Sequence, residues 1–493
     1  MRITLVSVCA PEFIRTAPLG ILYVGGALRQ AGHDVKVLHF TPDEIDVRAA
    51  EISRDNPVFV GISAFTCNQT KFSAELSRKI KAQCDSLVVW GGVHASLVSE
   101  QTLREPFVDM VVIGEGEETA ADLADAIDKG RDLHDVKGIG FKKDGKPVFT
   151  EERPLIQELD QYRIDWELVD IERYLVSMWG RSRVINFVTS RGCWFKCGFC
   201  YNLKFNQGRW RGHSTEFVLA EIQNLKERYG VDGIRFYDDN LFGRKKRALE
   251  IIEKMDLPWE GEFRIGYIKE DLAKKLAETK CQGICFGLES GNDRILKLIN
   301  KGQKVEDIIR GVTIMSRYPQ IRVSGCIILA NPTETREEVR NTINLCLQLW
   351  KIHPRMDISL GTFLPFPGVP LYSLVKEFGY TPPQRTEDWE VLNRTYRRRN
   401  LPWVPWVTDK DQDDFILATR YALLLSLGNL RVPVINKIPY WRLSHYNFTL
   451  PVELPPLEWL ERKFEDRQSR LSKMMRRLLP YVGQKRRLVK SFD

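Results

Sequence analysis

Apolar segments of strand length alternate with amphipathic segments of helical length through the first 135 residues. The expected strands are 3–8, 34–38, 58–63, 86–90 and 110–113, and helical spacing follows them at 19–31, 44–53, 69–83, 96–102 and 117–128. Strands that alternate with helices build βαβ units on a parallel sheet. Residues 1–135 are therefore predicted to form a doubly wound, flavodoxin-like α/β domain, whose ligands lie outside the carboxyl ends of the strands.

A second alternation of strands and helices runs through residues 181–380. Its expected strands are 184–189, 233–237, 262–267, 283–287, 322–329 and 357–363, with amphipathic helices such as 215–229 and 245–255 between them. Residues 136–180 join the two regions as a hairpin and linker, because Asp144-Gly145 is a turn sequence. Residues 381–493 contain neither repeats nor low complexity, and they are predicted to form a third, mainly helical and basic region.

The basic character of the chain is concentrated near its carboxyl end. The net charge is +8, and residues 461–493 alone hold eleven Lys and Arg against four Asp and Glu. Apolar residues in this stretch also fall at helical spacing: Leu457, Leu460, Phe464, Leu471, Met474 and Leu478. A basic amphipathic helix is typical of peripheral contact with a membrane, and a helix docked on the protein with a solvated basic face is the alternative. No RNA-binding module is recognisable, so nucleic acid is not an expected partner.

Composition is typical of a soluble globular protein with two or three domains. Of the 493 residues, 43% are hydrophobic and 28% are charged. We expect no signal peptide, because the amino terminus has the pattern of a strand, and no bilayer span, because Arg420 interrupts the apolar stretch 415–430. Ten cysteines without framework spacing favour the reducing cytoplasm.

Three cysteines follow the apolar segment 184–188 at close spacing. They are Cys193, Cys197 and Cys200, separated by three and two residues. Three thiolates can bind three irons of a four-iron, four-sulfur cluster and leave the fourth iron open, whereas an electron-transfer cluster has four cysteine ligands. A zinc site or simple burial is the alternative, but no histidine lies between His134 and His213 to complete a zinc site. The spacing therefore favours an iron–sulfur cluster with one open iron.

This triplet resembles the signature of the radical S-adenosylmethionine (SAM) superfamily. The resemblance implies a partial (β/α)6 barrel in residues 181–380, whose open iron binds the amine and carboxylate of SAM and whose cluster cleaves SAM to a 5′-deoxyadenosyl radical. It implies a flavodoxin- or ferredoxin-type electron donor as well. Matched residue by residue, it places Phe199 near the adenine, Asp238 and Asp239 near the methionine amine, and Glu289 with Ser290 near the ribose.

One further residue of the expected SAM pocket is Arg264, which could balance the SAM carboxylate. Each of these charged residues has an alternative structural role. Asp238 and Asp239 precede a helix and could cap it, and Glu289 could form a salt bridge at the end of its strand.

The first domain, taken with the triplet, resembles the cobalamin-binding radical SAM enzymes. The loop after the first strand, which includes Pro11, has no glycine and so excludes a nicotinamide-binding fingerprint. Glycines follow the later strands instead, where they let a bulky ligand approach the backbone. The resemblance implies that cobalamin contacts Pro11, Ser63, Gly91, Gly92, Gly114 and Glu115. The Asp-x-His-x-x-Gly motif of many cobalamin proteins is missing, so an empty structural domain is the alternative.

The combined resemblance predicts an enzyme that uses a [4Fe–4S] cluster, SAM and cobalamin to methylate an unactivated carbon or phosphorus centre of a small-molecule or lipid substrate. One alternative is radical cyclisation, rearrangement or oxidation without methyl transfer, as in anaerobic magnesium-protoporphyrin ester cyclase. A second alternative is a corrinoid-binding sensor or partner protein whose barrel is not catalytic.

Overall fold

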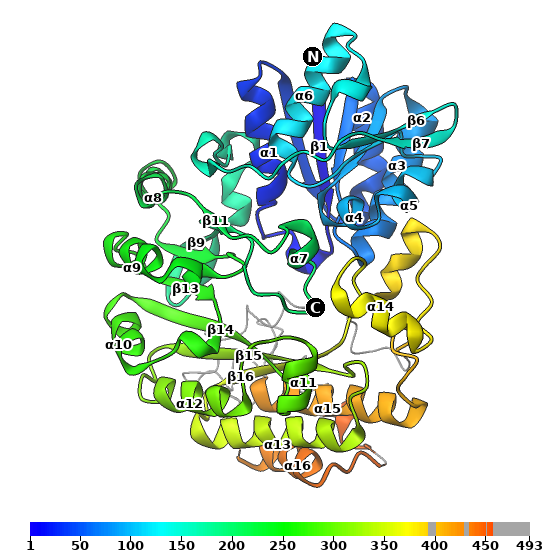
Figure 1. The fold of residues 1–493 in the computed structure, drawn as a ribbon. Coiled ribbons are helices and arrows are strands. Elements are labelled where there is room, and N and C mark those ends of the chain that lie inside the picture. The colour runs from blue at the N-terminus through cyan, green and yellow to red at the C-terminus, as the bar shows by residue number, and fades with distance from the viewer. Residues whose placement is uncertain (393–400, 428–432, 450, 457–493) are drawn as a thin grey trace.

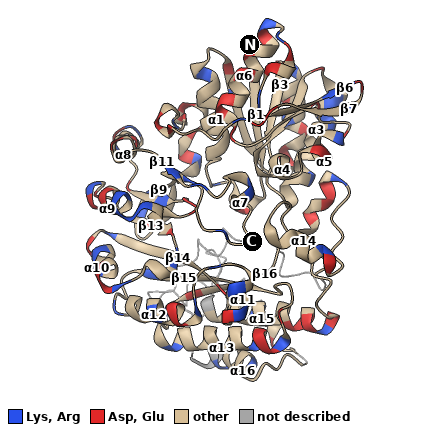
Figure 2. Cartoon of the chain, in the orientation of Figure 1, with Lys and Arg blue, Asp and Glu red and all other residues tan. Residues whose placement is uncertain are grey.

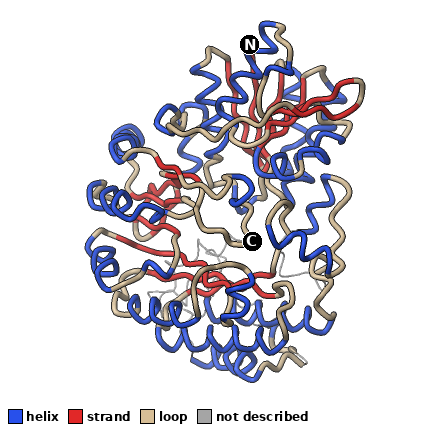
Figure 3. Tube along the Cα trace, viewed as in Figure 1, coloured by secondary structure: helices blue, strands red, loops and turns tan. Residues whose placement is uncertain are grey.

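The computed structural model describes residues 1–392, 401–427, 433–449 and 451–456 (Figure 1). The basic amphipathic helix expected in the carboxyl-terminal tail lies outside these residues. Two sheets stand one above the other in Figure 1, and a layer of helices closes the lower one from below. A small third sheet pairs β10 (Ser190–Arg191) antiparallel with β11 (Arg211–Gly212). Figure 3 shows that the described part of the carboxyl-terminal region is helical. The α/β fold class predicted from the sequence is confirmed.

The upper sheet has seven strands in the order β2-β1-β3-β4-β5-β6-β7. The bounds are Arg2–Val8 (β1), Asp34–Phe40 (β2), Phe59–Ser63 (β3), Leu87–Gly91 (β4), Met110–Val112 (β5), Ile139–Lys143 (β6) and Lys146–Phe149 (β7). The first five strands are parallel in the flavodoxin-like order, and the antiparallel β6–β7 hairpin extends the sheet at β5. The hairpin expected in the connecting segment therefore forms as part of this sheet.

Helices cover both faces of the upper sheet. They are α1 (Leu19–Gln30), α2 (Ile45–Asp55), α3 (Asn68–Gln83), α4 (Gly92–Leu97), α5 (Ser99–Arg104) and α6 (Gly116–Lys129). One apolar core joins the sheet to α2 and α3, and another joins it to α1 and α6. Since a doubly wound sheet is buried on both sides, β1 is buried throughout from Ile3 to Val8, and its apolar residues Ile3, Leu5, Val6 and Val8 alternate with the buried hydroxyls of Thr4 and Ser7.

The lower sheet has the strand order β16-β15-β14-β13-β12-β9-β8. The bounds are Val176–Met178 (β8), Arg181–Phe187 (β9), Gly233–Phe236 (β12), Trp259–Glu262 (β13), Cys281–Glu289 (β14), Arg322–Leu329 (β15) and Asp357–Thr362 (β16). Six strands are parallel, and β8 pairs antiparallel with β9 at the edge. Their helices are α8 (Thr215–Tyr229), α9 (Lys245–Lys254), α10 (Glu270–Glu278), α11 (Asp293–Leu298), α12 (Val305–Met315), α13 (Arg336–Ile352) and α14 (Pro370–Glu377). This is the predicted partial (β/α)6 barrel.

The third barrel strand lies earlier in the chain than the apolar pattern indicates. We expect it at 262–267, but β13 ends at Glu262 and residues 265–267 form one turn of 3-10 helix. The buried Trp259 pairs with Ile234 of β12 and with Cys281 of β14, and the register with β14 shifts directly after it. Ile265, which the pattern assigns to a strand, packs instead against Gly311 of α12.

The carboxyl-terminal region connects the two domains. A 3-10 segment, Thr386–Leu392, returns to the upper domain, where the Trp389 indole donates to Gln101 Oε1 at 2.7 Å. Helix α15 (Asp409–Leu427) lies under β16, and α16 (Pro433–His445) lies beside it and α13 (Figure 1). No helix within the described ranges combines the length and the apolar character that a bilayer crossing needs.

Candidate functional site

A cavity of about 390 Å³ lies between the upper sheet and the barrel. The carboxyl ends of β3, β4 and β5 form its upper wall, where a doubly wound sheet binds ligands. Five of the six expected cobalamin contacts line it: Ser63, Gly91, Gly92, Gly114 and Glu115. The sixth, Pro11, is exposed and is not among the residues that line the cavity. No histidine occurs among the described residues of the lining, in agreement with the missing histidine motif.

The lower wall of the cavity comes from the barrel. Val188, Ser190, Arg191, Tyr201, Tyr237 and Asp239 contribute to it. An aromatic contact closes one side, because the ring of Tyr201 meets those of Phe65 and Phe366 edge-on at centroid distances of 5.7 and 6.2 Å. The cavity therefore belongs to both domains, and a ligand in it would contact both.

A buried ion-pair cluster joins the domains at the edge of this cavity. Arg191 donates through Nη1 to Glu115 Oε1 at 2.8 Å and through Nη2 to Glu117 Oε1 at 2.6 Å. Arg211 donates to the second oxygen of Glu115 at 2.6 Å. Burial acts to raise the pKa of Glu115, but the two guanidinium groups outweigh it and hold that pKa below its usual value. Glu115, expected as a cofactor contact, therefore has both carboxylate oxygens occupied by barrel residues.

The cysteine triplet lies in the loop between Arg191 and the short helix α7 (Asn202–Phe205). The loop starts at Gly192, where only glycine fits: its φ is +83°, and a Cβ would lie 2.0 Å from the carbonyl oxygen of Arg209. Main-chain hydrogen bonds then tie Gly198 to Ile299 at 2.8 Å and to Leu371 at 3.1 Å. The cysteines are thus held against the barrel by backbone contacts at the start and the middle of the loop.

Two donors from the barrel approach the thiols. Arg264 Nη1 lies 3.6 Å from Cys197 Sγ, and Asn240 Nδ2 lies 3.7 Å from Cys193 Sγ. Hydrogen bonds to sulfur tune the potential of an iron–sulfur cluster. Arg264 Nη2 and Asn240 Oδ1 are buried without a partner among the described residues, so each still has bonding capacity for a ligand.

The three thiols come from one loop, and a cubane takes one thiolate for each of three irons. No three His, Cys, Asp or Glu side chains in the described part of the chain lie close enough to share one metal ion. Each thiolate of a cubane binds a different iron, so its ligands stand farther apart than those of zinc. Burial raises the pKa of Cys200 to about 12, so iron must displace its proton on binding.

Known proteins resemble this chain in both domains. Residues 187–346 match the model of the radical SAM superfamily, and residues 14–124 match that of the B12 binding domain. An uncharacterized methyltransferase, PH0819 of Pyrococcus horikoshii, is 35% identical over 373 residues, which cover 72% of this chain and 77% of the relative. This chain belongs to the radical SAM superfamily. The predicted family is confirmed, and the protein is an enzyme that uses SAM, a [4Fe–4S] cluster and cobalamin.

One further relative and one solved structure extend the likeness. The anaerobic magnesium-protoporphyrin IX monomethyl ester cyclase of Synechocystis is 29% identical over 409 residues, which cover 79% of this radical SAM enzyme and 78% of the cyclase. The solved structure of the radical SAM methyltransferase TsrM from Kitasatospora setae, with cobalamin and a [4Fe–4S] cluster bound, has a TM-score of 0.62 at 19% identity. That alignment covers 76% of this chain and 75% of TsrM, and it shows a shared fold.

The two aspartates expected near SAM differ in their surroundings. Asp238 is buried and accepts from the Thr189 hydroxyl at 2.7 Å, from the Thr189 amide and from the Ser190 hydroxyl, so it braces the turn after β9. Asp239 accepts from the Gly192 amide at 2.8 Å and also lines the interdomain cavity. Burial is the main cause that raises the pKa of each carboxyl. Asp239 is therefore the one that connects the cysteine loop with the cavity.

The residues expected near the ribose and the adenine form a second buried group. Glu289 ends β14 with a φ of +67° and accepts from Lys301 Nζ at 2.6 Å. Lys301 also lies 5.8 Å from the centre of the Phe199 ring. Ser290 lies apart from this group, because its hydroxyl contacts Thr342 Oγ1 at 3.3 Å and accepts from the Asn292 amide. Glu289 and Phe199 are thus brought together through Lys301.

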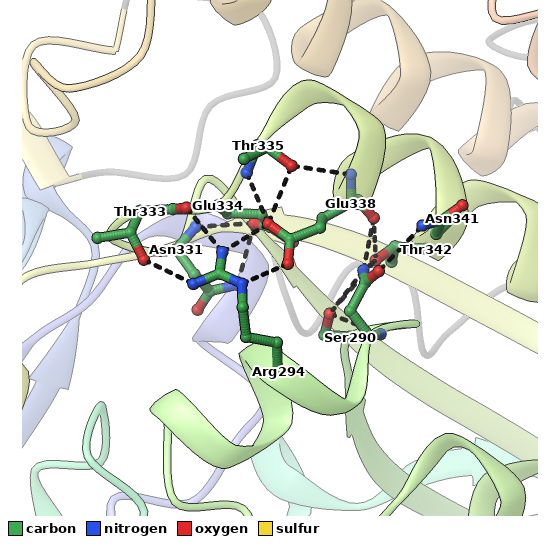
Figure 4. Close-up of polar contacts among 10 residues, drawn as sticks. Ser290, Arg294, Asn331, Thr333, Glu334, Thr335, Glu338, Asn341 and Thr342 are labelled. Atoms are coloured by element: carbon green, nitrogen blue, oxygen red, sulfur yellow. Dashed lines mark hydrogen bonds and ion pairs between the residues drawn. The ribbon is translucent and has the colours of Figure 1, made fainter.

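A polar cluster follows β15 next to Ser290 (Figure 4). Arg294 donates to Glu338 at 2.6 Å and to the Thr333 carbonyl at 2.8 Å, and Glu338 also caps the start of α13. Glu334 accepts from the Asn331 amide at 2.9 Å, whereas its Oε1 is buried without a partner among the described residues. Burial raises the pKa of Glu334 to about 7, and Arg294 lowers that of Glu338 to about 2.

Glu334 should make the stability of the enzyme depend on pH. Its folded-state pKa is raised, so the folded protein holds this proton more tightly than the unfolded chain, and stability should fall as the pH rises from about 4.5 to about 7. Glu334→Gln removes the buried charge, and above this range it should exceed the wild type by up to about 3 kcal/mol. Urea unfolding midpoints of the wild type and Glu334→Gln at both ends of this pH range measure the difference in stability. Glu337→Gln on the exposed face of α13 is the matched control, and an equal response of the two variants would contradict the assignment.

Proposed function

We propose that this enzyme transfers a methyl group to an unactivated carbon or phosphorus centre of a small-molecule or lipid substrate. One observation carries the proposal: the cavity of the B12 domain and the loop of the cysteine triplet share a wall. Arg191 lines the cavity and leads directly into Gly192 and Cys193, and Asp239 contacts the loop and the cavity at once. A substrate in the barrel next to this wall would lie close to both cofactor sites.

We infer that Cys193, Cys197 and Cys200 ligate the cluster. When bound, the cluster and SAM supply a 5′-deoxyadenosyl radical and the corrinoid carries the methyl group. We infer that Arg264 would bind the SAM carboxylate, because its Nη2 is buried without a partner in the described structure and a buried carboxylate needs a charged partner. Phe199 and the Glu289–Lys301 pair would hold the adenosine part. Asp239 keeps the Gly192 amide paired and so fixes the start of the loop.

The interdomain cavity is assigned to cobalamin. Glycines and Ser63 line its upper wall, and apolar side chains of the upper sheet and its helices, such as Leu5, Val89 and Leu123, also line it. The buried ion pairs of Arg191 and Arg211 with Glu115 border one edge, and a bound corrinoid would then be shielded from water there. Exclusion of water protects a reactive intermediate and strengthens the polar contacts that remain.

A size series at Gly20 tests this assignment without straining the backbone. Gly20 lines the cavity from α1, and a Cβ there would meet no atom within 4 Å. Gly20→Ala should bind cobalamin like the wild type, whereas Gly20→Phe should weaken binding at least about tenfold because its ring enters the cavity. Corrinoid per chain after anaerobic purification measures the effect, and iron per chain should stay constant. Equal corrinoid content in all three proteins would contradict the assignment.

Methyl transfer itself is tested with SAM that carries a labelled methyl group. The anaerobic enzyme would be incubated with this SAM and with fractionated small molecules and lipids, and products analysed by mass spectrometry. A product that gains the labelled methyl group, together with 5′-deoxyadenosine, supports the proposal. Release of 5′-deoxyadenosine with an unlabelled product would favour the second candidate, a radical cyclisation or oxidation, which the 29% identity to the ester cyclase makes the nearest rival. A protein that releases no 5′-deoxyadenosine would have a non-catalytic barrel.

We also propose a cytoplasmic enzyme with peripheral membrane contact through its carboxyl-terminal region. The described part of α16 supports this, because Ile438, Tyr440 and Trp441 are exposed there, and tyrosine and tryptophan are enriched at membrane interfaces. Flotation with anionic liposomes, with and without residues 457–493, tests the contact. Equal flotation of the two chains would show that the tail is not required.

A further inference from the structure

An exposed tryptophan lies immediately beside the proposed cluster ligands. Trp194 follows Cys193 in the sequence, and it is 42% exposed, whereas most large apolar side chains of the enzyme are buried. Its ring lies 5.8 Å from that of Trp210, which precedes β11 (Arg211–Gly212). Arg244 and Arg247 stand over Trp210 at 5.7 and 5.6 Å. An aromatic pair flanked by cations therefore marks the surface above the cysteine loop.

Basic side chains surround this pair. Lys196 and Arg209 are exposed in the segments that carry the two tryptophans, and Arg244, Lys245 and Lys246 are exposed at the start of α9. Lys245 pairs with Asp271 at 3.0 Å, but no ion pair within the described ranges involves the other four. Figure 2 places basic segments at β11 and on α9. Because the chain is nearly neutral before residue 461, this concentration of charge is local.

Two hydrogen bonds connect the aromatic pair with the cysteine loop. The Trp210 indole donates to the Asn240 carbonyl at 3.3 Å, and the Asn240 amide donates to Cys193 Sγ at 3.7 Å. Trp194 reaches the same cysteine through one peptide bond. The path from the surface to the cluster ligand is therefore short and consists of bonded and hydrogen-bonded atoms.

We propose that this surface is the docking site of a small acidic electron-transfer protein. We define the Trp194 surface by the residues Trp194, Lys196, Arg209, Trp210, Arg244 and Lys246. The inference rests on the proposed function, because it requires a cluster at the triplet. The reduced carrier of the partner loses one electron, and the cluster gains it. Unpaired cations attract an acidic partner and raise its rate of association, while an exposed tryptophan supplies the apolar contact that anchors an interface.

Two charge reversals outside the cysteine loop test the docking site. Arg244→Glu/Lys246→Glu changes the Trp194 surface, and Lys143→Glu/Lys146→Glu makes the same change in net charge on the exposed β6–β7 hairpin. The anaerobic holoenzymes would be mixed with a reduced acidic flavodoxin, and bleaching of the cluster absorbance followed in time. We expect reduction of the first variant to be about tenfold slower at low ionic strength and less dependent on salt, whereas the hairpin variant behaves like the wild type.

A second readout does not depend on the activity of the enzyme. Carbodiimide cross-linking joins lysines to partner carboxylates in direct contact, so flavodoxin should be linked to Lys196 and Lys246 of the wild type. Reduction by dithionite, which needs no docking, should be equal in all three proteins. The proposal would be overturned if flavodoxin reduced the wild type and both variants at equal rates, or if both variants lost the same fraction of that rate. Cross-links confined to other lysines would overturn it as well. A wild type that is reduced by flavodoxin but releases no 5′-deoxyadenosine would contradict the proposed function and leave the docking site standing.

Discussion

Replacement of Cys193 by alanine should abolish the release of 5′-deoxyadenosine, by more than about a thousandfold, because the protein offers no group that replaces the cluster. Each cysteine of the triplet is proposed to hold one iron, and none of the other seven cysteines lies in the same loop. Iron and sulfide per chain, together with the electron paramagnetic resonance signal of the reduced cluster, measure the loss directly.

The matched control is Cys346→Ala. Cys346 is buried in α13 among core residues, so its replacement should leave iron content and SAM cleavage intact. A Cys193→Ala protein that kept its full iron content would contradict the assignment of this residue. Parallel loss of iron in both variants would show a general sensitivity of the fold.

Replacement of Arg191 by methionine should have the largest effect on stability. Arg191 is the common partner of Glu115 and Glu117, and its removal leaves two carboxylates in a buried interface with only Arg211 to balance them. Breaking a buried pair in this way costs about 3–5 kcal/mol. Because these residues also border the interdomain cavity, the variant should bind less cobalamin than the wild type. The shift of the urea unfolding midpoint and the corrinoid content measure the two effects.

The surface pair Arg104–Glu100 provides the control for this experiment. Both side chains are more than 60% exposed, so Arg104→Met should cost less than about 1 kcal/mol. If Arg191→Met shifted the midpoint no more than Arg104→Met, the ion-pair cluster would not hold the domains together. Adding Glu117→Gln to Arg191→Met should recover part of the stability, because one buried charge is then removed.

The hydrophobic periodicity of the sequence predicted both sheets, because the pattern arises within each strand and each helix. A parallel strand buried on both faces is mostly apolar, as in β1, and its helices carry one apolar face, so the order of the elements can be read from the sequence. The exception is β13, whose short stretch Trp259–Glu262 contains one large apolar residue. Its position depends on pairing with β12 and β14, and that information lies outside the segment itself.

The candidate site could be predicted from the sequence where the residue type itself fixes the chemistry. The contacts between residues of distant segments could not. The triplet and the glycines after β4 and β5 could be recognised from spacing alone. The pairing of Glu115 with Arg191 and Arg211 joins residues 76 and 96 positions apart, and the contact of Asn240 with Cys193 spans 47. A motif can suggest that Glu115 or Asp238 binds a cofactor. Only the fold shows which protein groups already bond to these two carboxylates. Pro11 likewise follows β1 as expected, yet the loop leads it away from the cavity.

An open iron and a corrinoid are proposed to serve adjoining sites of this enzyme. The cofactor content of anaerobically purified, full-length protein tests this arrangement most directly. We expect about four irons, as many sulfides and about one corrinoid per chain, and added SAM should change the spectrum of the reduced cluster. This arrangement would be contradicted by zinc at the triplet, by a cluster whose spectrum does not change when SAM is added, or by a protein that takes up no corrinoid.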